Sequence, residues 1–320
     1  DGIRDGIVRL VGSEMCIRDS GMVGGAILRA LQARRDTGEA LDLITAHREE
    51  LDLCDPSAVR AFLHQTHPEV VILAAAKVGG IHANNTFPAD FIYENLMIQA
   101  NVIHQSHASG VQRLLQLGSS CIYPRDAAQP MTEAALLTGP LEATNEPYAI
   151  AKIAGIKLCE SYNRQHGTDY RSVMPTNLYG PGDNFHPENS HVVAGMMQRF
   201  EEARKTGAKE VVVWGTGKPM RELIFSDDLA DACVHLMNNY DGGGLINVGS
   251  SEEISIEGLA YLIAKVVGFS GQITFDTSRP DGTPRKIMDN SALQQSGWKP
   301  STSIEEGVYK MYSWWKDFGD

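Results

Sequence analysis

The chain has 320 residues, 42% hydrophobic and 21% charged, which is enough for one large or two smaller globular domains with a hydrophobic core. Its 28 Lys and Arg against 40 Asp and Glu give a net charge of −12, which argues against a nucleic-acid-binding protein. No apolar run approaches the length of a membrane span, so we expect no membrane partner.

The first twenty residues, DGIRDGIVRLVGSEMCIRDS, fit no regular pattern. They lack the basic, apolar and small-residue regions of a secretory signal. They also match no clean strand, although residues 7–11 (IVRLV) could form one. We interpret residues 1–20 as a foreign segment joined to a truncated chain. The alternative is a divergent first strand.

From Gly21 onward, helical and strand patterns alternate. The expected helices and strands, in chain order, are helix 22–35, strand 41–45, helix 56–66, strand 70–76, helix 88–108, strand 113–118, helix about 148–167 and strand 170–175. Apolar strands without alternation, each followed by a helix, predict a parallel sheet covered on both faces. Because Gly21 and Gly24 open the first helix, we predict an α/β fold with a doubly wound, Rossmann-like sheet.

Beyond residue 176 the pattern changes to Pro-, Gly- and Asn-rich loops, one amphipathic helix over 192–206 and short strands. We interpret this part as a smaller C-terminal substrate-binding region, made of residues 177–223 and 249–320. The Rossmann-like domain then comprises residues 21–176 together with about 224–248, which we expect to return to the main sheet.

The five cysteines are odd in number, scattered and never spaced as CxxC. They lie at positions 16, 54, 121, 159 and 233. This distribution is not that of a disulfide framework or a zinc site, so we expect no metal and a reducing compartment.

A nucleotide cofactor is indicated by the turn at Gly21 and Gly24, which lies one strand-helix unit before strand 41–45. Sites for NAD usually place an acid at the end of that second strand. Here Arg48 follows, and an arginine suits a 2′-phosphate, so we favour NADP(H). Alternatively, Arg48 is a solvated surface charge. Asp52 and Leu53 follow, where the aspartate could meet the adenine amine.

Tyr148 and Lys152 are four residues apart at the start of a helix, so they share one face. We expect the lysine cation to lower the pKa of the tyrosine, which could then donate a proton to a carbonyl oxygen near neutral pH. Ser119, at the end of a strand, would supply a second hydrogen bond to that oxygen. The three residues together predict a carbonyl reductase site.

Longer motifs carry a family resemblance. They are LGSSCIYP (117–124), EPYAIAKIAG (146–155), NSHV (189–192), VVVWGTGKPMRELIFSDD (211–228) and PDGTPRK (280–286). These motifs resemble those of the GDP-L-fucose synthase family within the extended short-chain dehydrogenase/reductases. The resemblance runs from Gly21 to the C-terminal helix.

The resemblance implies NADPH-dependent 3,5-epimerisation and 4-reduction of GDP-4-dehydro-6-deoxy-D-mannose to GDP-L-fucose. It also implies a cytoplasmic homodimer packed through helices near 88–108 and 148–165. Cys121 and His191 would be the acid/base pair for epimerisation, because a stabilised thiolate and an imidazole both exchange protons near neutral pH. The alternatives are a small buried hydrophobic role for Cys121 and a structural loop role for His191.

Further binding residues follow from the same resemblance. The cofactor would contact Ala74, Ala75, Leu117, Gly118, Ser119, Ser120, Tyr148, Lys152, Pro175, Thr176, Asn177, Leu178 and His191. The GDP-sugar would contact Arg199 and Arg221 through its diphosphate, Trp214 through guanosine, and Asp281 and Lys286 through the sugar or nucleotide. Plain alternatives are a solvated helix face for Arg199 and a core position for Trp214.

Two differences from the family pattern lie in the first turn, where Arg18 replaces a glycine and Ser20 replaces an arginine. Both changes would weaken cofactor binding. A catalytically dead nucleotide-binding homologue is therefore one alternative function. Another is a nucleotide-sugar 4-epimerase or dehydratase on the same scaffold, although a dehydratase would need an Asp-Glu pair where Ser120 and Cys121 stand.

Overall fold

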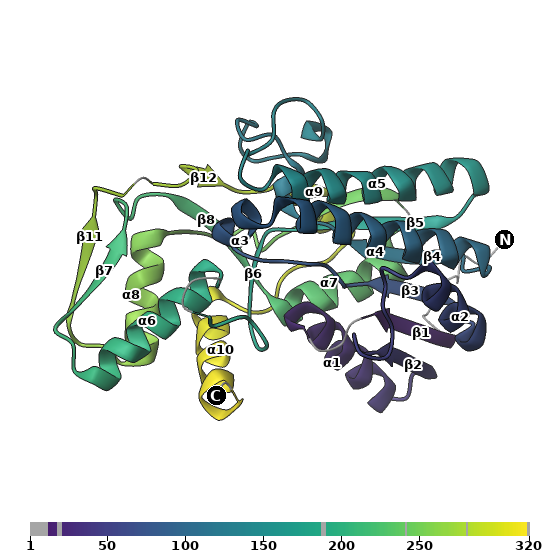
Figure 1. Cartoon of the computed structure of the whole chain (residues 1–320). Helices are drawn as coiled ribbons and strands as arrows, with labels where there is room; N and C mark the ends of the chain where they lie inside the picture. The colour runs from purple at the N-terminus through teal and green to yellow at the C-terminus, as the bar shows by residue number, and fades with distance from the viewer. Residues whose placement is uncertain (1–11, 18–20, 187–189, 241, 280, 319–320) are drawn as a thin grey trace.

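The computed structural model describes residues 12–17, 21–186, 190–240, 242–279 and 281–318 (Figure 1). Its main sheet has six parallel strands in the order β2-β1-β3-β4-β5-β9. The strands are β1 Gly12–Ile17, β2 Leu41–Ala46, β3 Val70–Leu73, β4 Arg113–Leu117, β5 Asp169–Pro175 and β9 Gly244–Val248.

The strand order reverses at β1, which pairs with β2 on one side and with β3 on the other. In open parallel sheets, ligands bind beyond the carboxyl ends of the strands at such a reversal. The sequence analysis offered residues 7–11 as a strand, and these lie outside the described residues. Residues 12–17 form the first strand, in agreement with the alternative of a divergent first strand. The foreign origin of residues 1–20 stays a prediction.

Helices cover both faces of the main sheet (Figure 1). Helices α1 (Met22–Asp36) and α7 (Ser226–Asn239) pack together on one face. Helices α2 (Pro56–Thr66), α4 (Pro88–Ala108) and α5 (Glu146–His166) cover the other. All four residues of β3 are buried, because a strand covered on both faces has no solvent side. The doubly wound Rossmann-like sheet is confirmed.

Helix α5 is fixed to the sheet by a buried amide pair. Gln116 of β4 donates a 2.8 Å hydrogen bond to Gln99 of α4, and Gln99 donates one of 3.1 Å to the carbonyl of Ala151 on α5. A Cβ at Gly155 would lie 2.3 Å from Oε1 of Gln99, so a glycine is needed there for close packing. This contact sets the position of the helix that carries Tyr148.

The C-terminal part forms two smaller sheets beside the main one (Figure 1). Strand β8 (Met220–Phe225) pairs with β6 (Asn177–Tyr179), β10 (Glu253–Ser255) and β12 (Arg285–Lys286). Strand β7 (Glu210–Trp214) pairs with β11 (Gln272–Asp276). Helices α6 (Val192–Thr206), α8 (Ile256–Val267) and α10 (Ile304–Phe318) pack together in a second core. The remaining short helices are α3 (Ile81–Thr86), η1 (Ser120–Ile122), η2 (Glu133–Ala135) and α9 (Ser291–Gln295).

Three helices have the bounds that the sequence predicts, namely 56–66, 88–108 and 192–206. The strand expected over 70–76 ends at Leu73, because its pairing with β4 stops there. Beyond residue 176 the sequence analysis named only the helix over 192–206 and a C-terminal helix, whereas α7, α8 and α9 also form. Strand β9 joins the main sheet, but β8, whose last two residues fall in the segment 224–248, pairs in the smaller sheet. The exact division into two regions stays a prediction.

Among the described residues, no helix combines the length and the apolar composition needed to cross a lipid bilayer.

Candidate functional site

A cavity of about 640 Å³ lies at the carboxyl ends of β3, β4 and β5, beside the reversal of strand order. All the residues expected to contact the cofactor line it: Gly21, Gly24, Arg48, Asp52, Leu53, Ala74, Ala75, Leu117, Gly118, Ser119, Ser120, Tyr148, Lys152, Pro175, Thr176, Asn177, Leu178 and His191. Cys121 and Lys286 line it as well. The fold thus brings together all five residues expected to be catalytic.

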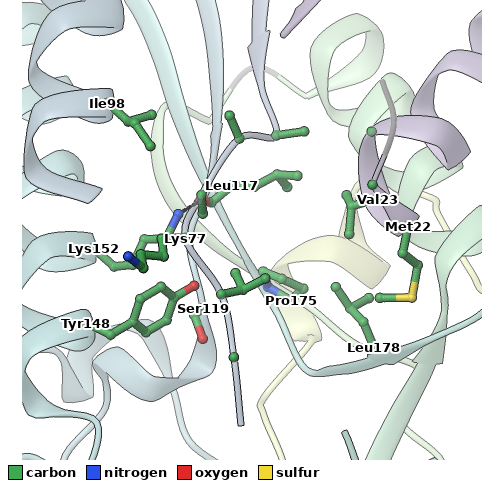
Figure 2. Close-up of a pocket in the computed structure, with 18 of the residues that line it drawn as sticks. Met22, Val23, Lys77, Ile98, Leu117, Ser119, Tyr148, Lys152, Pro175 and Leu178 are labelled. Carbon is green, nitrogen blue, oxygen red and sulfur yellow. Dashed lines mark hydrogen bonds between the residues drawn. The ribbon is translucent and has the colours of Figure 1, made fainter. Parts of the chain in front are cut away.

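Ser119, Tyr148 and Lys152 lie on one side of the cavity, with Met22, Val23 and Leu178 across from them (Figure 2). Lys152 is buried, and its Nζ donates a 2.7 Å hydrogen bond to the carbonyl of Leu117 at the end of β4. This bond ties α5 to the strand that leads into Ser119. The spacing of four residues on α5 puts Tyr148 one turn before that anchor.

The pKa of Tyr148 lies above its ordinary value in this structure, so the net lowering expected beside Lys152 is not found. Burial is the main cause that raises the pKa of Tyr148, Cys121 raises it further, and a hydrogen bond with Ser119 lowers it. Nζ of Lys152 lies 5.8 Å from the ring centroid of Tyr148, and burial lowers the pKa of this lysine to about 8. Desolvation of the phenolate is therefore the dominant influence on this phenol.

Cys121 is half-buried on η1, two residues after the Ser119 cap, and its N–H donates a 3.3 Å hydrogen bond to Oγ of that serine. His191 is exposed and forms the N-cap of α6. Because both side chains line the cavity, Cys121 is not a residue of the hydrophobic core. Both residues therefore border the same cavity.

Gly21, Gly24 and Arg48 line the cavity as well. Helix α1 follows Gly21, has no side-chain cap and carries no acid in its first turn. Arg48 is exposed and makes no ion pair with any carboxylate that the structure describes. Oδ1 of Asp52 accepts a 2.9 Å hydrogen bond from the N–H of Cys54, so part of this carboxylate is already used.

Four residues expected to bind substrate lie outside the cavity lining, in a second cluster on β7, β8, α6 and the loop before β12. Trp214 is 62% exposed, which excludes the core position considered for it. The guanidinium carbons of Arg199 and Arg279 lie 5.9 and 5.1 Å from its ring centroid. Both cations are thus within cation–π range of one indole ring.

Arg221 and Asp281 hold the loops of this second cluster. Nη1 of Arg221 donates hydrogen bonds to the carbonyls of Met220 and Thr283, at 2.8 and 2.7 Å. The carboxylate of Asp281 accepts 2.8 and 2.7 Å hydrogen bonds from the N–H and hydroxyl of Thr216. These bonds lower the pKa of Asp281, with the Thr216 N–H as the largest cause. Lys286, by contrast, lines the main cavity.

The sequence analysis missed several residues that line the cavity. Lys77 and Glu94 form an ion pair there, and a hydrogen bond from this pair is the main cause that raises the pKa of Lys77. Lys77 follows β3 after Ala74–Ala76. Because ligands bind beyond the carboxyl ends of parallel strands, this position could have indicated that Lys77 lines the cavity. Gly182 and Asp183 also line the cavity, and a Cβ at Gly182 would lie 3.2 Å from Cα of Met22. No sequence signal predicts that this distant loop packs on the glycine turn.

Comparisons with known proteins agree with this geometry. A family model described as "NAD dependent epimerase/dehydratase family" matches residues 19–249. GDP-L-fucose synthase 1 from Arabidopsis thaliana is 57% identical over 295 residues, which cover 92% of this chain and 90% of that protein. GDP-L-fucose synthase from Escherichia coli (strain K12) is 55% identical over 309 residues, covering 94% and 95%.

The chain belongs to the GDP-L-fucose synthase family. A solved structure of a GDP-L-fucose synthetase from Naegleria fowleri, bound to NADP, matches with a TM-score of 0.88 at 28% identity, and covers 97% of this chain and 95% of that one. The family resemblance read from the motifs is confirmed, and so is the extended short-chain dehydrogenase/reductase fold. The match to the Arabidopsis protein covers 92% of this chain, so the similarity extends beyond the main sheet into the C-terminal part.

Proposed function

We propose that this chain converts GDP-4-dehydro-6-deoxy-D-mannose to GDP-L-fucose by 3,5-epimerisation and NADPH-dependent 4-reduction. One observation carries the proposal. Ser119, Cys121, Tyr148, Lys152 and His191 line one cavity in a chain that is 57% identical to a GDP-L-fucose synthase over 92% of its length. A thiol and an imidazole beside a tyrosine–lysine pair supply both kinds of proton transfer that the two stages need.

The residues present fit NADP(H). The uncapped N-terminus of α1, with no acid in its first turn, suits a pyrophosphate, and the exposed Arg48 suits a 2′-phosphate. Pro175, Thr176 and Leu178 would lie against the nicotinamide side. When bound, NADPH supplies the hydride that reduces C4.

Epimerisation requires removal of the protons at C3 and C5 of the sugar, which the C4 ketone makes acidic. Cys121, as a thiolate, would take a proton from carbon, and the electron pair of that C–H bond would move onto the C4 oxygen. His191 would return a proton to the opposite face of the ring. Ser119 and Tyr148 would stabilise the charge that develops on the C4 oxygen in both stages.

Reduction then requires a proton on the C4 oxygen. Tyr148 would donate it, with Ser119 orienting the ketone by a second hydrogen bond. Because burial raises the pKa of Tyr148, its phenol stays protonated at neutral pH and is a donor rather than a base. The Lys152 ammonium, fixed by Leu117, would stabilise the phenolate that this proton transfer leaves behind.

The second cluster is our proposed site for the nucleotide end of the substrate. The exposed ring of Trp214 would stack on guanine, and Arg199 with Arg221 would contact the diphosphate. Lys286, which lines the cavity, would contact the sugar end. The role proposed for Asp281 is to hold the Thr216 turn beside Trp214.

We also propose a cytoplasmic homodimer that pairs through α4 and α5. Two large apolar residues on these helices, Tyr93 and Ile150, are 62% and 42% exposed, which is consistent with a covered face. The division into an NADP-binding part (21–176 and about 224–248) and a substrate-binding part (177–223 and 249–320) belongs to the same proposal.

Product analysis tests the proposed function. The purified chain is incubated with GDP-4-dehydro-6-deoxy-D-mannose and NADPH, and the product is identified by NMR. We expect GDP-L-fucose, with C3 and C5 inverted and C4 reduced. A C4-reduced sugar with unchanged C3 and C5 would contradict the epimerase stage. Tightly bound NAD⁺ with no net reduction would favour a 4-epimerase, and a chain that binds no NADPH would favour the inactive homologue.

A further inference from the structure

The side chain of Asn145 contacts the sulfur of Cys121. Its Nδ2 lies 3.5 Å from Sγ, which is hydrogen-bond distance for a sulfur acceptor. Oδ1 of the same amide is buried and accepts no hydrogen bond from the residues that the structure describes. A buried amide oxygen without a partner costs free energy. Among the described residues, the hydrogen bond to Cys121 is the one that this side chain makes in return.

The backbone of Asn145 is held firmly. It is the N-cap residue of α5, its N–H donates to the carbonyl of Glu142 at 3.3 Å, and its carbonyl accepts a 2.9 Å bond from Ala149. Oε2 of Glu142 also accepts hydrogen bonds from the N–H groups of Thr144 and Asn145, at 3.1 and 3.2 Å. The amide is therefore delivered to the sulfur from a fixed position, three residues before Tyr148.

Cys121 is held from two sides. Its N–H donates to Oγ of Ser119 at 3.3 Å, and its sulfur accepts from Asn145. The serine fixes the backbone of the residue, while the amide restricts the side-chain rotamer. Since Cys121 lines the cavity, this rotamer decides where the sulfur stands relative to a ligand.

We propose that Asn145 is a positioning residue that stabilises the thiolate of Cys121 and directs its sulfur toward the sugar. An N–H donor binds an anionic acceptor more strongly than a neutral one, so it favours the deprotonated sulfur. The thiolate takes the proton from carbon and becomes a thiol, while the C–H electron pair moves onto the C4 oxygen. The inference rests on the proposed function only for the identity of the ligand.

The test is the pH profile of Cys121 alkylation by iodoacetamide in the complete chain, followed by peptide mass spectrometry. Thiolates react and thiols do not, so the midpoint of the profile reports thiolate formation. In Asn145→Ala we expect the midpoint to rise by about one pH unit, the size of a lost hydrogen bond to a charged group. In Asn145→Asp the carboxylate repels the thiolate, so the midpoint should rise further.

Two controls separate this effect from general loosening. Thr144→Ala perturbs the same loop, because it removes a 2.5 Å hydrogen bond to Glu142, without touching the sulfur. Its midpoint should equal that of the wild type. Cys54, a second half-buried thiol on the cavity wall, is the internal control, and its profile should stay unchanged in all variants. Thermal unfolding checks that each variant is folded.

Equal midpoints in the wild type and in folded Asn145→Ala and Asn145→Asp would overturn the proposal, and so would an equal shift in Thr144→Ala. Solvent deuterium uptake by the sugar keeps the two proposals apart. If the midpoint shifts in Asn145→Ala but uptake does not depend on Cys121, the role of Asn145 stands and the proposed epimerase chemistry fails. If uptake depends on Cys121 but the midpoint does not shift in Asn145→Ala, the proposed epimerase chemistry stands and the role of Asn145 fails.

Discussion

The ammonium group of Lys152 donates a 2.7 Å hydrogen bond to the carbonyl oxygen of Leu117, the last residue of β4. Helix α5 and the strand that leads to Ser119 are thereby joined at one atom pair. Because Lys152 is buried, desolvation lowers its pKa to about 8. The charge at this junction is consequently lost within an accessible pH range.

This relationship predicts that the rate of reduction falls at alkaline pH. Lysine is charged below its pKa, so raising the pH through about 8 removes the cation that stabilises the Tyr148 phenolate. We expect hydride transfer, followed by NADPH absorbance in single turnovers, to fall as the pH rises from about 7 to 9. In Lys152→Arg the cation persists, so the rate is lower overall but this fall disappears. A wild-type rate that stays constant across this range would contradict the role of the cation.

Tyr148→Phe should slow reduction by about 10²- to 10⁴-fold, the usual contribution of a general acid. NADPH binding, measured by fluorescence titration, should change little because the ring remains. Tyr162→Phe is the matched control, since Tyr162 lies on the same helix and bonds His104 instead of facing the cavity. Comparable losses in both variants would mean that the helix, rather than the phenol, was damaged.

The sequence predicts most of this site because its residues lie at the ends of regular elements. Ser119 follows a buried strand, Tyr148 and Lys152 share a helix face, and the structure brings them together as expected. The shift of the Tyr148 pKa was predicted in the wrong direction, because charge proximity can be read from spacing whereas burial cannot. Burial depends on how α4, α5 and β4 close together, through Gln99, Gln116 and Gly155.

Contacts between distant segments were beyond the reach of local patterns. The Gly182 loop packs on Met22, and Asn145 meets Cys121 across 24 positions. Neither contact has a sequence spacing that indicates it. Helix α8 was missed for a related reason, because its apolar face is buried only in the second core that it forms with α6 and α10.

Arg48→Ala should weaken NADPH binding and leave NADH binding nearly unchanged. The guanidinium has no described carboxylate partner and lies on the cavity wall, where it would contact the 2′-phosphate that NADH lacks. We expect the Kd for NADPH, from fluorescence titration, to rise about 10- to 100-fold, the value of one to two hydrogen bonds to a charged group. Arg60→Ala, on α2 and outside the cavity lining, is the control. Equal losses for both cofactors would refute the assignment of Arg48.

Glu222 is a buried carboxylate whose loss should destabilise the chain. Its oxygens accept hydrogen bonds from the N–H groups of Met288 and Ser251 and from the Asn290 amide, at 3.0, 2.8 and 2.7 Å. Glu222→Ala leaves the N–H groups of Met288 and Ser251 without this acceptor, while the Asn290 amide keeps longer 3.3 Å hydrogen bonds to Ser251 and Met288. We therefore expect urea unfolding at pH 7 to show a loss of about 3 kcal/mol. Glu252→Ala, an exposed neighbour, should change stability by less than about 0.5 kcal/mol.

The pH dependence of that stability follows from the same group. Burial raises the pKa of Glu222 against the opposing effect of its hydrogen bonds. The raised pKa therefore adds to the free energy of unfolding at a pH below the pKa of a free glutamate. This added stability is lost as the pH rises through the pKa of Glu222 in the folded chain. Glu222→Ala should lack this decline. Parallel pH profiles for the variant and the wild type would show that Glu222 does not titrate in this way.

Deuterium uptake tests the central claim, that Cys121 and the Tyr148–Lys152 pair act on one sugar ring. The chain is incubated with the GDP-sugar and NADPH in D₂O, and the product is analysed by mass spectrometry. We predict deuterium at C3 and C5 with the wild type, and uptake reduced at least about 100-fold in Cys121→Ser, with NADPH binding retained. Unchanged uptake in Cys121→Ser would contradict the account.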